Sequence, residues 1–262
     1  DLADYVSLHR YVGNRDNDTP NYLAVTNSID RQIEEMDAVC RFVQAKRRSK
    51  KRAYLCFDEW NVWYKNHDGN GAGKFAPHLL EEIYNLEDAL VVAGFLHSFV
   101  RHADVLKIAN IAQIVNVIAP VLTEGDKLLV QPIFYPFEMF SRRRAGTALR
   151  VALDGPAYDT RSHGAAPYID ASAILDGKSL HLFLTNRHPG EAADVTARLA
   201  DGDLVSAASA EILAGPDPKA ANTFAQPDLL QAVPFAEIAF ANGQARCQLP
   251  PLSFAALTLN LR

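Results

Sequence analysis

The first half of the chain alternates short apolar runs with longer segments in which apolar side chains recur at helical spacing. The short runs predict strands at residues 5–8, 53–57 and 105–109. The helical spacing predicts helices at residues 29–43, 86–102 and 133–144. Ser28 and Asn85 are the expected N-caps of the first two helices, and Pro132 opens the third. Three strand-helix units in succession are typical of a parallel β/α arrangement.

From about residue 147 the pattern changes to short runs, several of alternating polarity, separated by Gly, Pro, Asp and Asn. This pattern predicts an all-β sandwich or jelly-roll, with strands at residues 149–153, 168–174, 179–185, 194–199, 208–213, 235–240 and 254–259. Residues 200–218, rich in small residues and turn formers, are expected to end in a longer loop. The change in pattern predicts two domains, at residues 1–146 and 147–262.

The β/α part is too short to close a barrel by itself. A closed TIM barrel takes about 250 residues, and residues 1–146 hold only three strand-helix units. We therefore expect an α/β partial TIM barrel followed by the all-β domain, as a piece of a longer protein. Such a piece leaves sheet edges and apolar helix faces open, so a partner chain or contacts between copies should cover them.

Composition narrows the classes of function. The 262 residues are 48% hydrophobic and carry a formal net charge of −5, which excludes a mainly disordered chain and gives no reason to expect nucleic acid as a partner. No window approaches about 18 uncharged apolar residues, so no membrane span is expected. The cysteines Cys40, Cys56 and Cys247 lie far apart and predict neither a disulfide framework nor a zinc site. They favour a reducing compartment, and we expect the cytoplasm.

Three conspicuous features have structural interpretations. Residues 46–52 hold six basic side chains in seven positions, and a solvated face explains them better than contact with RNA. His97 and His102 are five positions apart, which does not place them on one helical face, so we expect no metal and no cofactor. The glycine-rich residues 69–73 are expected to form a mobile loop over the edge of the sheet.

The strongest chemical signal is the run of residues 57–64, where a buried strand ends. In β/α barrels, catalytic groups gather at the carboxyl ends of strands. Because strand side chains alternate, Asp58 and Glu59 should face opposite sides of the sheet. Glu59 should lie on the same side as Leu55 and Phe57 and point into a central site. The aromatic residues that follow, including the only two tryptophans, suit the apolar faces of sugar rings. A solvated acid beside core aromatics explains the run equally well.

Polar side chains also follow the other two strands. His9 and Tyr11 share a parity and can face one pocket, where a tyrosine hydroxyl can donate to a nucleophilic carboxylate. Hydrogen bonds to loop carbonyls are the simpler alternative. Gln113 and Asn116 lie in an apolar stretch, and burial would require partners for them, either backbone groups or a substrate hydroxyl.

Several of these segments together resemble one known family. Residues 7–11, 45–51, 58–64, 86–92 and 113–120 are similar, in this order, to the α-L-arabinofuranosidases of glycoside hydrolase family 51. The resemblance covers roughly residues 1–145, and the β-rich remainder is consistent with the family's C-terminal domain. It implies that the chain holds barrel strands six to eight, the last three βα units, of a retaining glycosidase.

The resemblance also implies roles for the candidate residues. Glu59 corresponds to the catalytic nucleophile, and Tyr11 is placed to hold it. The substrate-binding residues would be His9, Trp63, Gln113 and Asn116. The implied reaction is the release of terminal L-arabinofuranosyl residues from arabinan or arabinoxylan oligosaccharides.

The family's acid/base glutamate follows the fourth strand and would lie outside this chain. The N-terminal part of the enzyme is therefore an expected partner, and the resemblance also implies a homo-oligomer, often a hexamer. Two alternatives stay open. One is another retaining glycosidase of the same clan, against which the Trp-Asn-Val-Trp-Tyr run argues, and the other is an inactive carbohydrate-binding or assembly fragment.

Overall fold

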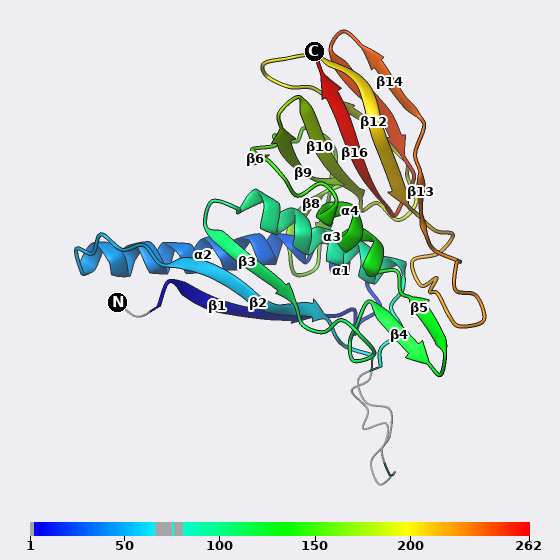
Figure 1. The fold of residues 1–262 in the computed structure, drawn as a ribbon, viewed down its shortest axis with the longest axis horizontal. Helices are drawn as coiled ribbons and strands as arrows, with labels where there is room; N and C mark the ends of the chain where they lie inside the picture. Colours follow the sequence, from blue (N-terminus) through cyan, green and yellow to red (C-terminus); the bar gives the residue numbers. More distant parts are fainter. Residues whose placement is uncertain (1–2, 66–74, 76–80) are drawn as a thin grey trace.

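The computed structural model describes residues 3–65, 75 and 81–262, which form three layers (Figure 1). A parallel sheet lies at the bottom of the view, helices lie in the middle, and antiparallel sheets lie at the top. The helices therefore support the parallel sheet from one side and the antiparallel layer from the other.

The parallel sheet consists of β1 (Tyr5–Val12), β2 (Tyr54–Val62) and β3 (Leu106–Ile111). The strands are ordered β1-β2-β3, and both pairs are parallel. The helices are α1 (Thr19–Leu23), α2 (Thr26–Lys46), α3 (Leu86–Arg101) and α4 (Phe134–Ser141). The three predicted strands and three predicted helices are confirmed, and α1, capped by Asp18, is additional.

The remaining strands all pair antiparallel, and most of them lie in the upper layer of Figure 1. They are β4 (Val121–Glu124), β5 (Lys127–Val130), β6 (Thr147–Leu149), β7 (Ala157–Thr160), β8 (Gly164–Pro167), β9 (Ile169–Asp176), β10 (Ser179–Asn186), β11 (Ala193–Ala197), β12 (Leu204–Leu213), β13 (Ala232–Pro234), β14 (Ile238–Ala241), β15 (Gln244–Leu249) and β16 (Ser253–Leu261). A six-stranded sheet has the order β13-β12-β16-β10-β9-β6, and a three-stranded sheet has the order β11-β15-β14. The pairs β4-β5 and β7-β8 form separate two-stranded sheets.

Helix α3 lies at the centre of the molecule. Asn85 and Asp88 exchange side-chain and backbone hydrogen bonds at its start, which confirms Asn85 as the N-cap. The helix is buried almost all round, because the parallel sheet packs on one side and β9 and β10 pack on the other. An apolar helix without a polar face is suited to this position.

Aromatic rings connect the layers into one hydrophobic core. Trp60 of β2 is fully buried and packs on Phe95 of α3, with ring centroids 4.9 Å apart. On the other side of the helix layer, Phe140 of α4 stacks on Phe183 of β10 at 3.9 Å. Trp60 is thus a core residue, and the aromatic run after Glu59 serves partly for packing.

The structure corrects several predicted boundaries. β1 and β2 run past their predicted ends into the polar candidate residues, because the parallel ladder continues there. The strand predicted at residues 208–213 begins earlier, because residues 204–213 form β12 and pair with β16, and residues 214–218 after it lie outside any strand, as expected. Ser28 is not an N-cap, since α2 begins at Thr26 and Ser28 Oγ donates to the carbonyl of Val25. The glycine-rich residues 69–73 lie outside the described residues.

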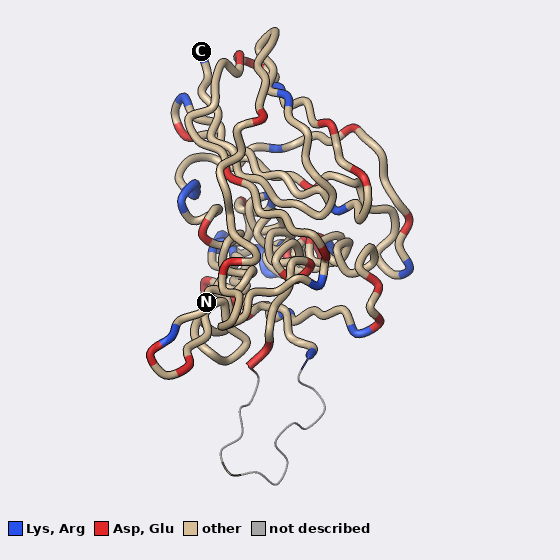
Figure 2. The backbone as a smooth tube through the Cα atoms, turned by 90° about the vertical axis from the view of Figure 1, so that its right-hand side faces the viewer, with Lys and Arg blue, Asp and Glu red and all other residues tan. Residues whose placement is uncertain are grey.

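Acidic and basic residues are interspersed along the chain in the view of Figure 2. The basic residues 46–52 form the end of α2 and the connection into β2, as predicted. Within this connection, Lys51 pairs with Asp4 and Arg52 pairs with Asp37. Among the residues that the structure describes, no helix is long and apolar enough to cross a membrane.

Candidate active site

Strand β1 presents two candidate side chains on the open face of the parallel sheet. Leu8 and Val12 are buried in the core behind the sheet. Because strand side chains alternate, His9 and Tyr11 lie on the opposite face. The strand register places His9 beside Glu59 of β2.

Strand β2 contains a β-bulge at residues 58 and 59. Phe57 and Trp60 pair with Ala109 and Ile111 of β3, so three steps along β2 match two steps along β3. One extra residue is therefore inserted in β2. Phe57 and Trp60 both pack on Phe95 of α3, although simple alternation would put residues three positions apart on opposite faces.

The bulge overturns the predicted orientation of these residues. Leu55 and Phe57 are fully buried in the core on the helix side and do not point into a central site. Asp58 and Glu59 do not face opposite ways, because both approach His9. The distances are 3.4 Å from His9 Nε2 to Asp58 Oδ1 and 3.4 Å from His9 Nδ1 to Glu59 Oε2. Strict alternation gave the wrong prediction here, because the extra residue changes which side of the sheet the following side chains face.

Glu59 is held from two sides and stays accessible. The Tyr11 hydroxyl donates a short hydrogen bond to Glu59 Oε1, and His9 Nδ1 faces Oε2. Burial, together with the hydrogen bond to Glu59, raises the pKa of Tyr11, so the phenol keeps its proton and acts as a donor. Trp63 packs edge-on against the Tyr11 ring at 5.3 Å. The Glu59 side chain remains 42% exposed, which leaves room for a reacting group.

Asp58 has a different environment. Ser7 Oγ donates a 2.7 Å hydrogen bond to Asp58 Oδ1. This hydrogen bond lowers the pKa of Asp58, and nearby His9 lowers it further. The Asp58 carboxyl group is therefore kept ionised. In this form it can accept hydrogen bonds, but it has no proton to donate as a general acid.

Gln113 and Asn116 lie in the segment that follows β3. Gln113 is exposed, and within the described part of the chain no hydrogen bond joins it to Glu59. Asn116 has a φ of 63° and holds a turn, in which its amide exchanges hydrogen bonds with Thr123. Substrate binding by Gln113 or Asn116 stays a prediction.

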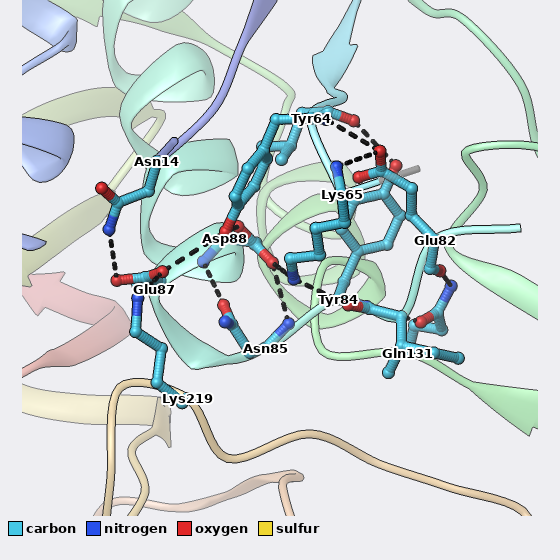
Figure 3. A network of polar contacts seen from close by, with 12 residues as sticks. Asn14, Tyr64, Lys65, Glu82, Tyr84, Asn85, Glu87, Asp88, Gln131 and Lys219 are labelled. Atoms are coloured by element: carbon cyan, nitrogen blue, oxygen red, sulfur yellow. Dashed lines mark hydrogen bonds and ion pairs between the residues drawn. The ribbon is translucent and has the colours of Figure 1, made fainter. Parts of the chain in front are cut away.

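A buried polar cluster at the end of β2 was missed by sequence reasoning (Figure 3). Three carboxylates form its centre, and Glu82, Glu87 and Asp88 are each 0% exposed. Lys65 Nζ lies 2.5 Å from Asp88, and Lys219 Nζ lies 2.5 Å from Glu87. Burial raises the pKa of Asp88, although Lys65 opposes this effect. Acidic residues at the start of an apolar helix were the only signal, and the helix dipole explains those by itself.

This carboxylate cluster fastens the segments that leave the candidate site. Glu82 Oε1 accepts the backbone N–H groups of Tyr64 and Lys65, directly after β2, at 2.7 Å. Glu87 Oε2 accepts a 3.1 Å hydrogen bond from Asn14, directly after β1. The two strands that carry His9, Tyr11 and Glu59 are thus anchored at their carboxyl ends.

Comparisons with known proteins agree on one family. A profile of the α-L-arabinofuranosidase C-terminal domain matches residues 58–253. An intracellular exo-α-(1→5)-L-arabinofuranosidase of Bacillus subtilis is 44% identical over 193 residues, which are 71% of this chain and 38% of that protein. The corresponding enzyme of Streptomyces lividans is 36% identical over 260 residues, which are 97% of this chain and 39% of that protein.

A solved structure of a family 51 α-L-arabinofuranosidase from Bifidobacterium longum is similar over 98% of this chain and 53% of that chain. The TM-score is 0.90 and the sequence identity is 29%. The chain thus spans about two fifths to one half of the length of the relatives it matches.

Proposed function

The chain belongs to the α-L-arabinofuranosidases of glycoside hydrolase family 51, as a C-terminal portion, and on this basis we propose that it supplies the nucleophile half of a retaining glycosidase. One observation supports this proposal above the others. Glu59 lies on the open face of the parallel sheet with a protonated tyrosine on one oxygen and His9 facing the other. A solvated surface acid would not need this arrangement.

In this proposal β1 to β3 are the last three strands of an eight-stranded barrel, within residues 1–146, and residues 147–262 form a β-sandwich domain. The order β1-β2-β3, with parallel pairing and with the helices of the described residues on one face of the sheet, supports this interpretation. Half-exposed His9 and Glu59 would then line the interior of the closed barrel. The remaining units would come from the part of the relatives that this chain does not span.

The proposed chemistry proceeds in two displacements. A Glu59 oxygen attacks the anomeric carbon of a terminal arabinofuranosyl unit, and the bond from that carbon to the leaving oxygen breaks. A second carboxyl group, about 5–5.5 Å from the first in retaining enzymes, protonates the leaving oxygen. That same group then takes a proton from water, whose oxygen releases arabinose and restores the Glu59 carboxylate. Asp58 is a poor candidate for this acid, because Ser7 stabilises its ionised form.

The other candidate residues receive supporting roles. Tyr11 holds Glu59, His9 and Trp63 shape the sugar pocket, and Gln113 and Asn116 reach sugar hydroxyls when the barrel is complete. The names of the relatives, exo-α-(1→5)-L-arabinofuranosidases, favour terminal arabinofuranosyl units as the substrate. Arabinan or arabinoxylan oligosaccharides as the source of these units follow from the family resemblance. The same names favour the cytoplasm. Self-association, by the family resemblance as a hexamer, is part of the proposal.

The test is reconstitution of the complete enzyme. This chain is combined with the N-terminal part of the Streptomyces lividans relative, by co-expression or by fusion, and assayed on an aryl α-L-arabinofuranoside. We expect activity from the combination and none from the chain alone. Glu59→Gln should lower kcat by about a thousandfold or more, with unchanged circular dichroism, because the nucleophile is lost. Activity of the variant close to that of the wild type would refute the proposal, and the absence of activity in the wild-type combination would favour an inactive binding or assembly fragment.

A further inference from the structure

We propose that Asp58 is a positioning residue that acts through His9 on Glu59, an inference that rests on the proposed function. The β-bulge places two consecutive carboxylates on the same face of the sheet. Bulges often re-aim a side chain next to an active site. Here the result is that one imidazole lies between Asp58 and Glu59, 3.4 Å from each.

Asp58 is itself fixed by its neighbours. Ser7 Oγ donates to Asp58 Oδ1 at 2.7 Å, and Ser7 lies on β1 two positions before His9. The same oxygen, Oδ1, faces His9 Nε2. The Asp58 carboxylate is therefore held against β1 at a defined distance from the imidazole.

The position of Asp58 decides which way His9 is turned. Imidazole has two distinct nitrogens, and a hydrogen bond made by one fixes the direction in which the other points. With Nε2 held by Asp58, Nδ1 is directed at Glu59 Oε2, and the ring donates to both carboxylates when both nitrogens carry a proton. Tyr11 already donates to Glu59 Oε1. A correctly turned His9 therefore completes a two-sided hold on the nucleophile, and without Asp58 the exposed imidazole is free to rotate away.

A double-mutant cycle in the reconstituted enzyme tests this role. Asp58→Asn alone should lower kcat about tenfold, because His9 loses the partner that directs it at Glu59. In the His9→Gln background the same change should have no further effect, because its target is gone. Ser7→Ala should also lower kcat, and it should have no further effect in the His9→Gln background. Additive losses in the cycle would overturn the proposal, as would an Asp58→Asn enzyme with unchanged kcat.

A matched control and a second measurement separate this inference from the proposed function. Asp201→Asn removes an exposed carboxylate in the turn before β12 and should leave kcat unchanged. In the present chain, ¹⁵N NMR of the His9 ring nitrogens should respond to Asp58→Asn and not to Asp201→Asn. Unchanged His9 signals would refute the positioning role even where activity cannot be reconstituted. Loss of activity in Glu59→Gln together with a neutral Asp58→Asn would retain the proposed function and reject only this inference.

Discussion

At the scale of residues, the contact between the Tyr11 hydroxyl and the Glu59 carboxylate carries most of the proposed chemistry. Because burial and Glu59 both raise the pKa of Tyr11, the phenol stays protonated at any pH where a glycosidase works. A protonated phenol orients the carboxylate through Oε1, while His9 faces the other oxygen, Oε2. Trp63, packed edge-on against the ring, limits how far Tyr11 can move.

Tyr11→Phe tests this contact by removing the hydroxyl and keeping the ring. A hydrogen bond to a charged group contributes about 1.5–3 kcal/mol, so kcat of the reconstituted enzyme should fall roughly 10- to 100-fold. Steady-state kinetics on an aryl arabinofuranoside measure the change. Tyr5→Phe, at a 45% exposed tyrosine on the same strand, serves as the control and should behave like the wild type. Equal kcat values for the two variants would contradict a role for the Tyr11 hydroxyl.

The limits of sequence reasoning also become clear at this scale. Alternation in β1 was enough to group His9 with Tyr11, because β1 is regular between them. Alternation failed in β2, because a bulge depends on how two neighbouring strands pair, which no local pattern records. The contact between Ser7 and Asp58 was missed for the same reason, since its partners are 51 positions apart.

At the scale of elements, apolar periodicity identified α3 because nearly all of its surface is buried. The strands β4, β5, β7, β8 and β13 were missed, because each has only three or four residues and lacks a clear alternation of polarity. The six-residue strand β15 does alternate in polarity and was missed as well. Helix α3 also carries a buried histidine against the antiparallel layer. His97 Nδ1 and Nε2 lie 2.9 Å from Ser172 Oγ and 3.0 Å from Thr185 Oγ1.

His97 makes the packing of α3 on β9 and β10 sensitive to acid. Burial lowers the pKa of His97 from 6.5 to about 4, so the folded state resists protonation that the unfolded state accepts below about pH 6.5. The free energy of unfolding should therefore be unaffected by His97 above pH 7 and should fall by roughly 2–3 kcal/mol as the pH drops towards 4. Urea denaturation between pH 4.5 and 7.5 measures this slope. The His97→Gln variant should have a lower free energy of unfolding at pH 7, but this free energy should change less with pH than that of the wild type. If the variant shows the same pH dependence as the wild type, His97 is not the cause of the acid sensitivity.

At the scale of the whole molecule, one core contains residues from both sides of the predicted boundary after residue 146. The segment between β12 and β13 adds a polar link to this core. The carbonyl oxygens of Ala220 and Pro218 accept the backbone N–H groups of Leu86 and Glu87, at 2.9 and 3.0 Å. The first turn of α3 thus obtains partners for N–H groups that a helix cannot satisfy itself. The antiparallel part of the chain therefore helps to hold the helix that supports the parallel sheet.

Lys219 is the charged part of this link, and its removal tests whether the layers support one another. Its Nζ lies 2.5 Å from Glu87 Oε1, and Glu87 is completely buried. Lys219→Met should lower the free energy of unfolding by about 1–3 kcal/mol. This loss of stability is smaller than the loss expected for a fully buried ion pair, because Lys219 is 41% exposed and Glu87 keeps its hydrogen bonds from Asn14 and Thr19. Chemical denaturation gives the value.

Lys178→Met, in the exposed turn between β9 and β10, is the matched control and should be neutral. Adding Glu87→Gln to Lys219→Met should recover part of the loss, because the uncompensated buried charge disappears. If Lys219→Met is as stable as the control, the ion pair adds nothing to the backbone contacts at the start of α3. A loss that Glu87→Gln partly restores would show that the antiparallel layer stabilises, through one buried carboxylate, the helix behind the proposed catalytic strands.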